Sequence, residues 1–196
     1  MFHTTKLRRA TVILLLPVLI ACSKSSATTA SPTGTASTSG GASAAVYVHS
    51  LCTSMNDWVT AIKARAARVG SDVASADTLV KRRALVVAYF GNMAGLTGQL
   101  VDKVKALGPP DVSGGAADHT VFVNAFMAAQ QIFVAAQTTA KSLPVNDAKA
   151  FKTAFTASLT ALQSASTQIG TALSSLNGGD LDTAAVADTA CQTIGQ

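Results

Sequence analysis

Apolar residues recur at steps of three, four or seven along most of the chain, which is the spacing of one face of an α-helix. Four long runs of this kind occupy residues 48–69, 79–107, 122–143 and 151–176, and a weaker one covers 181–191. No stretch alternates apolar and polar residues in the manner of a β-strand. The pattern therefore predicts an all-α fold.

Helix-breaking residues separate these runs. Gly108-Pro109-Pro110 follows the second run, Pro144 follows the third, and Asn146 is the expected N-cap of the fourth. Short connections between long amphipathic helices favour an antiparallel up-and-down four-helix bundle, here with a short C-terminal helical segment. We assign this bundle to a single domain over residues 46–196.

Three glycines, Gly91, Gly95 and Gly98, lie inside the second run. Each costs roughly 1 kcal/mol relative to alanine in a helix, so the tertiary structure is expected to use the missing side chains. Two interpretations are open: close packing of a neighbouring helix, which we favour, or a groove that these glycines line together with Phe90 and Met93 and that takes an apolar ligand. The third run offers a row of rings that would fill the gap: Phe122, Phe126 and Phe133.

The N-terminus has the features of an export signal. Lys6, Arg8 and Arg9 precede an apolar stretch over residues 10–21. That stretch is shorter than the roughly 20 residues needed to span a bilayer, and it has the length of the apolar part of a secretory signal. The Arg8-Arg9 pair also suggests a twin-arginine signal, which its neighbours match poorly. We therefore expect residues 1–21 to be a signal peptide.

The end of this stretch, Leu19-Ile20-Ala21-Cys22, resembles the bacterial lipobox. The resemblance implies a lipoprotein whose mature chain begins at Cys22, with diacylglycerol on the cysteine sulfur, anchored in the cell membrane on its extracytoplasmic face. Two acyl chains anchor a protein in a membrane far more stably than one chain does. The alternative is an ordinary secretory signal with a chance cysteine near its cleavage site.

Residues 22–45 are almost entirely Ser, Thr, Ala and Gly. They cannot bury enough apolar surface to offset the entropy of ordering, so we expect a disordered linker between anchor and domain. Random-coil statistics give it an end-to-end distance of roughly 25 Å.

The formal charge of +5 comes largely from the signal. Without Lys6, Arg8 and Arg9 the chain has 12 Lys and Arg against 10 acids, all of them Asp. Proteins that bind nucleic acid usually carry a basic face with interleaved aromatic residues. The one dense cluster here, Lys81-Arg82-Arg83, is interpreted as a solvated helix turn, and no nucleic acid partner is expected.

Two cysteines remain after Cys22, namely Cys52 and Cys191. An even number of thiols in an exported domain favours a disulfide, because that compartment is oxidising. Two free thiols, or a metal site made by Cys52 with His49, remain as alternatives.

The layout of the domain resembles a group of uncharacterised small exported helical-bundle lipoproteins of actinobacteria. The features that carry the resemblance are Cys52 with Trp58, the Leu107-Gly108-Pro109-Pro110 break, the phenylalanine-rich third run and the terminal Ala190-Cys191-Gln192. The resemblance agrees with a bundle and a disulfide, and it implies no activity.

Catalytic residues are sparse. The three histidines, His3, His49 and His119, fall in separate segments, and neither a phosphate-binding glycine loop nor a zinc signature occurs. We expect no enzymatic activity, no cofactor and no bound metal. The predicted function is a membrane-tethered binding or interaction module for an envelope protein or an apolar ligand. The alternative is a metal or haem carrier that uses His49, His119, Met55 or Met93.

Overall fold

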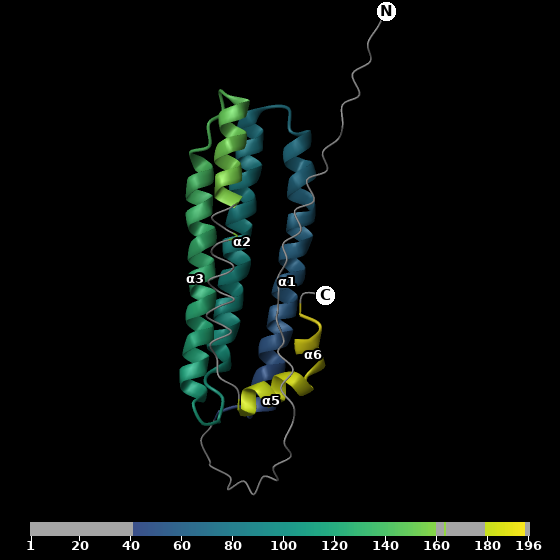
Figure 1. The fold of residues 1–196 in the computed structure, drawn as a ribbon, viewed down its shortest axis with the longest axis vertical. Coiled ribbons are helices and arrows are strands. Elements are labelled where there is room, and N and C mark those ends of the chain that lie inside the picture. Colours follow the sequence, from purple (N-terminus) through teal and green to yellow (C-terminus); the bar gives the residue numbers. More distant parts are fainter. Residues whose placement is uncertain (1–40, 160–162, 164–178, 195–196) are drawn as a thin grey trace, which may run out of the picture. The chain divides into compact units, whose positions relative to one another are not determined.

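The computed structural model describes residues 41–159, 163 and 179–194 (Figure 1). The described part of the chain is helical and contains no strand, which confirms the all-α prediction. The expected signal, Cys22 and the linker up to residue 40 lie outside the described residues, as does most of the fourth predicted run. The helices are α1 (Ala44–Ser75), α2 (Leu79–Leu107), α3 (Gly115–Lys141), α5 (Asp180–Ala187) and α6 (Thr189–Gln192), with a further helical segment at 148–159.

The helix ends follow capping chemistry. Ser43 and Thr78 cap α1 and α2 by accepting hydrogen bonds from the backbone N–H groups of Val46 and Lys81. The chain leaves α2 through Gly108, whose φ of 64° suits glycine and few other residues. Helix α1 thus begins at Ala44, just inside the stretch expected to be linker.

The helical segment 148–159 has a different cap from the one predicted. Asp147 Oδ1 accepts hydrogen bonds from the N–H groups of Lys149 and Ala150 at 2.8 and 3.1 Å. The predicted cap at Asn146 is therefore one residue too early. A carboxylate also complements the positive end of the helix dipole better than a neutral amide does.

The three long helices pack side by side, and neighbours run antiparallel (Figure 1). Helix α2 lies between α1 and α3. The ion pair between Asp57 and Lys103 joins the first half of α1 to the last part of α2. Gln130 and Gln137 of α3 lie over Gly98 and Gly91 of α2, in the order that an antiparallel pair requires.

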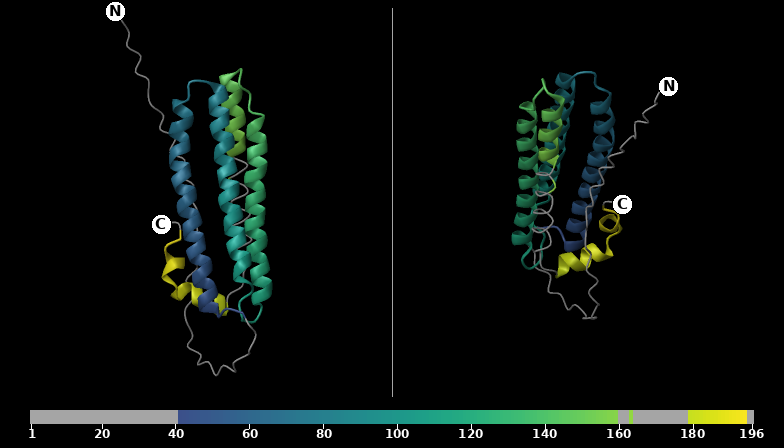
Figure 2. Two further views of the ribbon diagram at one scale, coloured as in Figure 1. Left: turned by 180° about the vertical axis from the view of Figure 1, so that it is seen from behind. Right: turned by 45° about the horizontal axis from the view of Figure 1, so that its top comes forward.

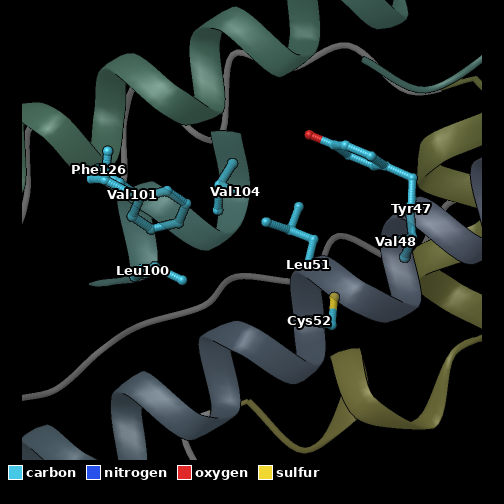
Figure 3. Close-up of a cluster of buried hydrophobic side chains, with 8 residues drawn as sticks. All are labelled: Tyr47, Val48, Leu51, Cys52, Leu100, Val101, Val104 and Phe126. Atoms are coloured by element: carbon cyan, nitrogen blue, oxygen red, sulfur yellow. The ribbon is translucent and has the colours of Figure 1, made fainter. Parts of the chain in front are cut away.

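The buried residues form two clusters along these helices. The first, shown in Figure 3, gathers around the start of α1, the end of α2 and the first half of α3: Tyr47, Val48, Leu51, Cys52, Leu100, Val101, Val104 and Phe126. The second gathers around the start of α2, the end of α3 and the segment 148–159: Val86, Phe90, Ala136, Ala140, Leu143 and Phe151. Packing is thus divided between the two ends of the long helices.

We name these ends by their chemistry. The disulfide end comprises residues 41–58, 97–126 and 179–194, and the basic end comprises residues 59–96 and 127–159. Figure 2 shows α5 and α6 beside α1 at the disulfide end, and the connection between α1 and α2 at the basic end. Every described residue except Gln163 belongs to one of the two.

By length and composition alone, α2 and α3 are apolar enough to cross a membrane. Both helices place apolar side chains in the clusters just described, where they meet other helices of the same chain. Core helices of helical proteins commonly have this character, so the composition of α2 and α3 carries no conclusion about membrane insertion.

Candidate functional site

The charges beyond residue 40 are strongly segregated between the two ends. The basic end has nine Lys and Arg against three Asp, a net formal charge of +6, and the disulfide end has two Lys against seven Asp, a net of −5. The nine cations come from both halves of the α1–α2 hairpin and from the α3 terminus with its following segment: Lys63, Arg65, Arg68, Lys81, Arg82, Arg83, Lys141, Lys149 and Lys152. The overall charge beyond residue 40 is almost neutral, and the fold gathers most of the cations at one end and most of the acids at the other.

An apolar cleft of about 450 Å³ lies at the basic end, open to solvent on one side. The last turns of α1, the first turns of α2 and the segment 148–159 enclose it. Its apolar lining comes from Val69, Val73, Leu79, Phe151 and Phe155, with Gly70, Ala74 and Ala148 beside them. This volume lies in the range of roughly 300–1,000 Å³ that small-molecule sites occupy.

Helix α1 contributes an unusually exposed surface to the cleft. Its buried residues are all in its first turns, and the last of them is Cys52. Val69 and Val73, on the same helix, are only half-buried. The cleft therefore presents apolar side chains that the described residues do not fully cover.

Two cationic side chains complete the lining, Arg82 and Lys152. Arg82 Nε donates a hydrogen bond to the Ala76 carbonyl at 3.1 Å, which holds the stem of the side chain against the α1–α2 connection. Its neighbour Lys81 instead pairs with Asp77 at 2.9 Å. The structure shows no ion pair between Arg82 or Lys152 and any described carboxylate.

A second hollow of about 560 Å³ lies on another side of the α1–α2 connection. Its lining includes Asp72 and Lys81 together with Leu85. Charges of both signs and few large apolar side chains make it a weaker candidate for an apolar ligand than the cleft.

At the opposite end, a disulfide joins Cys52 to Cys191, as the sequence predicts, with their Cα atoms 4.9 Å apart. Polar contacts support the covalent link. The Asn56 side-chain amide donates hydrogen bonds to the Ala190 carbonyl at 2.6 Å and to Thr193 Oγ1 at 3.0 Å. The C-terminal helices are thus fastened to α1, and neither cysteine has a free thiol for a metal.

His49 meets Asp188 rather than a metal-binding group. Its Nδ1 lies 2.9 Å from Asp188 Oδ2, and Asp188 also caps α6 by accepting from the N–H groups of Ala190 and Cys191. The hydrogen bond from His49 is the main cause that lowers the pKa of Asp188. This contact is exposed and belongs to the attachment of the C-terminal helices.

His119 meets Tyr47 in the first turns of α3 and α1. The Tyr47 hydroxyl lies 3.0 Å from His119 Nδ1, and the two rings meet edge to face. Burial, and to a smaller extent the charge of Asp118, raise the pKa of Tyr47 to about 12. Burial lowers the pKa of His119, so the pair favours a neutral tyrosine and a neutral imidazole.

The residues named for a metal or haem carrier do not converge. Met93 is fully buried in α2, Met55 packs against the cluster at the disulfide end, and the two helical histidines have the partners just described. Within the described residues, no three His, Cys, Asp or Glu side chains are grouped closely enough to hold a metal ion.

The residues of the candidate groove are distributed over different surroundings. Phe90 and Met93 are fully buried. The amides of Gln137 and Gln130 lie over Gly91 and Gly98, while a Cβ added at Gly95 would meet none of the described residues within 4 Å. Glutamine side chains of α3 therefore meet Gly91 and Gly98 of α2, and the row of phenylalanines does not. Phe126 is instead part of the core at the disulfide end (Figure 3).

No protein family model, no curated protein and no solved structure matches the chain.

The cleft is the site that sequence reasoning missed. Its signal was present in Lys81-Arg82-Arg83 next to apolar residues, but the cleft needs Phe151 and Phe155, whose proximity to α1 only the fold shows.

Proposed function

We propose that the protein is a lipid-anchored, non-catalytic binding module on the extracytoplasmic face of the cell membrane, and that it holds a small apolar ligand in the cleft at its basic end. The cleft is the observation that carries this proposal. Apolar side chains from three helical segments, half-buried except for the buried Phe151, line one hollow with few polar groups, which is the usual make-up of a small-molecule site.

The proposed anchor at Cys22 agrees with the position of the cleft. The described chain enters α1 at the disulfide end, where the Asp111 N–H donates to the Ala42 carbonyl at 2.8 Å. Helix α2 has 29 residues, and at 1.5 Å per residue it carries the cleft about 40 Å from this entry point. The described chain therefore enters the domain at the end remote from the cleft. Mass spectrometry of the N-terminal peptide tests the anchor, and an unacylated Cys22 would contradict it.

We also propose that the domain is completed as a four-helix bundle by the fourth predicted run. Between Cys52 and the cleft, α1 keeps apolar side chains that are only half-buried, including Val59 and Ile62. The sequence over 151–176 has the helical apolar spacing needed to cover such side chains. Segment 148–159 already packs its Phe151 against the second cluster.

Binding of the neutral fluorescent probe N-phenyl-1-naphthylamine tests the function. The protein to use is the mature chain 22–196 with Cys22→Ala, so that no acyl anchor competes for the cleft. Gly70 lines the cleft and has open space around its Cα, so Gly70→Phe places a ring in the hollow. Gly95→Phe is the matched control, because Gly95 is also an exposed helical glycine with open space but lies away from the cleft.

We expect the wild type and Gly95→Phe to bind the probe with the same affinity, and Gly70→Phe to bind it at least tenfold more weakly. Equal binding by all three proteins, or binding by none, would contradict a ligand site in the cleft. Circular dichroism of both variants checks that the helices are retained.

The alternative function, a metal or haem carrier, gains no support from the positions of His49 and His119, each of which has a side-chain partner within the chain. Elemental analysis and visible absorbance of protein purified without chelators test this alternative. A stoichiometric metal or a Soret band would favour it over the binding module.

A further inference from the structure

We infer that the ligand of the cleft is a single-chain anionic amphiphile, whose apolar tail lies against the α1 and Phe155 surfaces and whose acid group is bound by Arg82 and Lys152. This inference rests on the proposed function and adds the chemical class of the ligand. The acid group is a carboxylate or a phosphate, because the two present the same charged oxygens to these side chains.

The first support is the placement of the two cations. Arg82 and Lys152 come from different helical segments and both line the apolar hollow. The hydrogen bond from Arg82 Nε to the Ala76 carbonyl uses one of the five guanidinium donors. The remaining donors form the planar fork that binds carboxylate and phosphate groups in a bidentate manner.

The second support is the field around the cleft. Nine cations and three Asp share the basic end. One of these acids, Asp77, is paired with Lys81. A cleft lined by one sign of charge beside a low-dielectric wall attracts ions of the opposite sign and increases their local concentration. A neutral apolar ligand would gain nothing from this arrangement.

The third support is the shape of the hollow. Its apolar wall runs from Val69 and Val73 of α1 to Phe151 and Phe155. A volume of about 450 Å³ lies toward the lower part of the range for small-molecule sites, roughly 300–1,000 Å³, which suits one tail better than two. Since one side is open, the acid group stays at the rim where the cations are.

Isothermal titration calorimetry with lysophospholipids below their critical micelle concentration tests the ligand class. The probes are a 14-carbon lysophosphatidylglycerol and a 14-carbon lysophosphatidylcholine, which share a tail and differ in net charge, and myristate supplies the carboxylate. The protein is the mature chain with Cys22→Ala. The test variant is Arg82→Gln with Lys152→Gln. The control is Lys103→Gln with Lys105→Gln, which removes the same charge from the disulfide end.

We expect the wild type and the control to bind the anionic lysolipid and myristate at least tenfold more tightly than the zwitterionic lysolipid, and the test variant to lose that preference. Equal affinity of the wild type for all probes would overturn the inference that the ligand is anionic, and it would leave the proposed apolar site standing. No binding of any lysolipid, together with no binding of the naphthylamine probe, would overturn the site itself. Binding to vesicles of phosphatidylglycerol without binding of monomeric lysolipid would show a membrane-docking surface instead, and would also overturn the inference.

Discussion

The two ends of the long helices are held together by different forces. At the disulfide end, bonds between residues far apart in sequence accumulate: the Cys52–Cys191 link, Tyr47 with His119, Asn56 with Ala190, Trp58 with Thr97 and Asp57 with Lys103. At the basic end, the polar contacts around Lys81 and Arg82 reach only to the adjacent α1–α2 connection. There the second apolar cluster joins the start of α2, the end of α3 and the segment 148–159.

From this difference we expect the disulfide end of the helical framework to be the more rigid of the two. Directional and covalent links fix the relative positions of helices, whereas apolar contacts tolerate small shifts. Regions that bind ligands are commonly drawn from the less stable parts of a structure. The cleft lies at the end of the second apolar cluster, where nine of the described cations are gathered.

Removal of the disulfide should produce the largest change. The bridge spans 139 positions of the sequence, and loss of such a link typically costs about 2–5 kcal/mol of unfolding free energy. We expect urea unfolding of Cys52→Ala with Cys191→Ala to show a loss in this range. Naphthylamine binding to the folded fraction should be unchanged, because the cleft lies at the other end.

Hydrogen exchange sharpens this test. In the double alanine variant, amides of α5 and α6 should exchange much faster. The exchange rates of α2 amides beside Phe90 should rise only as much as the loss of global unfolding free energy explains. If the cleft loses its probe at temperatures where the helices remain folded, the two ends are coupled and the comparison fails.

A smaller effect is expected from alkaline pH through Tyr47. Its pKa is about 12 in the folded protein and about 10 in the unfolded chain. The folded state therefore holds the proton more tightly, so this contribution to stability is complete below pH 10 and is lost as the pH rises toward 12. Between pH 9 and 11.5 the stability advantage of the wild type over Tyr47→Phe should shrink by up to about 2 kcal/mol, which is the value that the full difference in pKa gives before solvent screening reduces it.

Urea unfolding at several pH values measures this difference, and groups that both proteins share cancel from it. Tyr89 at the basic end, whose pKa burial also raises, is likewise present in both. A constant difference between wild type and Tyr47→Phe across this range would contradict the assigned burial of the phenol.

The smallest effect should come from the glycines of α2. Because no atom of the described residues lies within 4 Å of a Cβ added at Gly95, Gly95→Leu should stabilise the protein by about 0.5–1 kcal/mol through helix propensity. Gly91→Leu is the contrast, since the new side chain meets Gln137 and must displace it. Thermal melts should give Gly95→Leu a higher melting temperature than the wild type and than Gly91→Leu.

Much of the fold could be predicted from the helical spacing of apolar residues. The bounds of α2, Leu79–Leu107, agree with the predicted run, because an N-cap threonine and a Gly-Pro-Pro sequence mark its ends. Helix α3 begins earlier than its apolar run, at Gly115. Its first turn contains small and polar residues, and apolar periodicity does not detect such turns. The disulfide followed from the cysteine count and the expected compartment.

The site was less predictable, for a physical reason. Periodicity reports which face of a helix is apolar, and it does not report which helix that face meets. Gly91 and Gly98 indicated a close approach correctly, but the groups that approach are the amides of Gln137 and Gln130, which the pattern had placed among the polar positions. Likewise, Lys152 and Arg82 border one hollow only because the chain turns back between them.

The Cys52–Cys191 link also decides what happens when the backbone is cut. All of α2 and α3, and the cleft, lie inside the covalent ring that this bond closes. A protease that nicks any one exposed peptide bond within the ring leaves both fragments joined to residue 52, and through it to the proposed anchor at Cys22. Nicked copies would therefore stay on the cell, and shedding the binding domain would require a second cut, a reductant or cleavage in the linker.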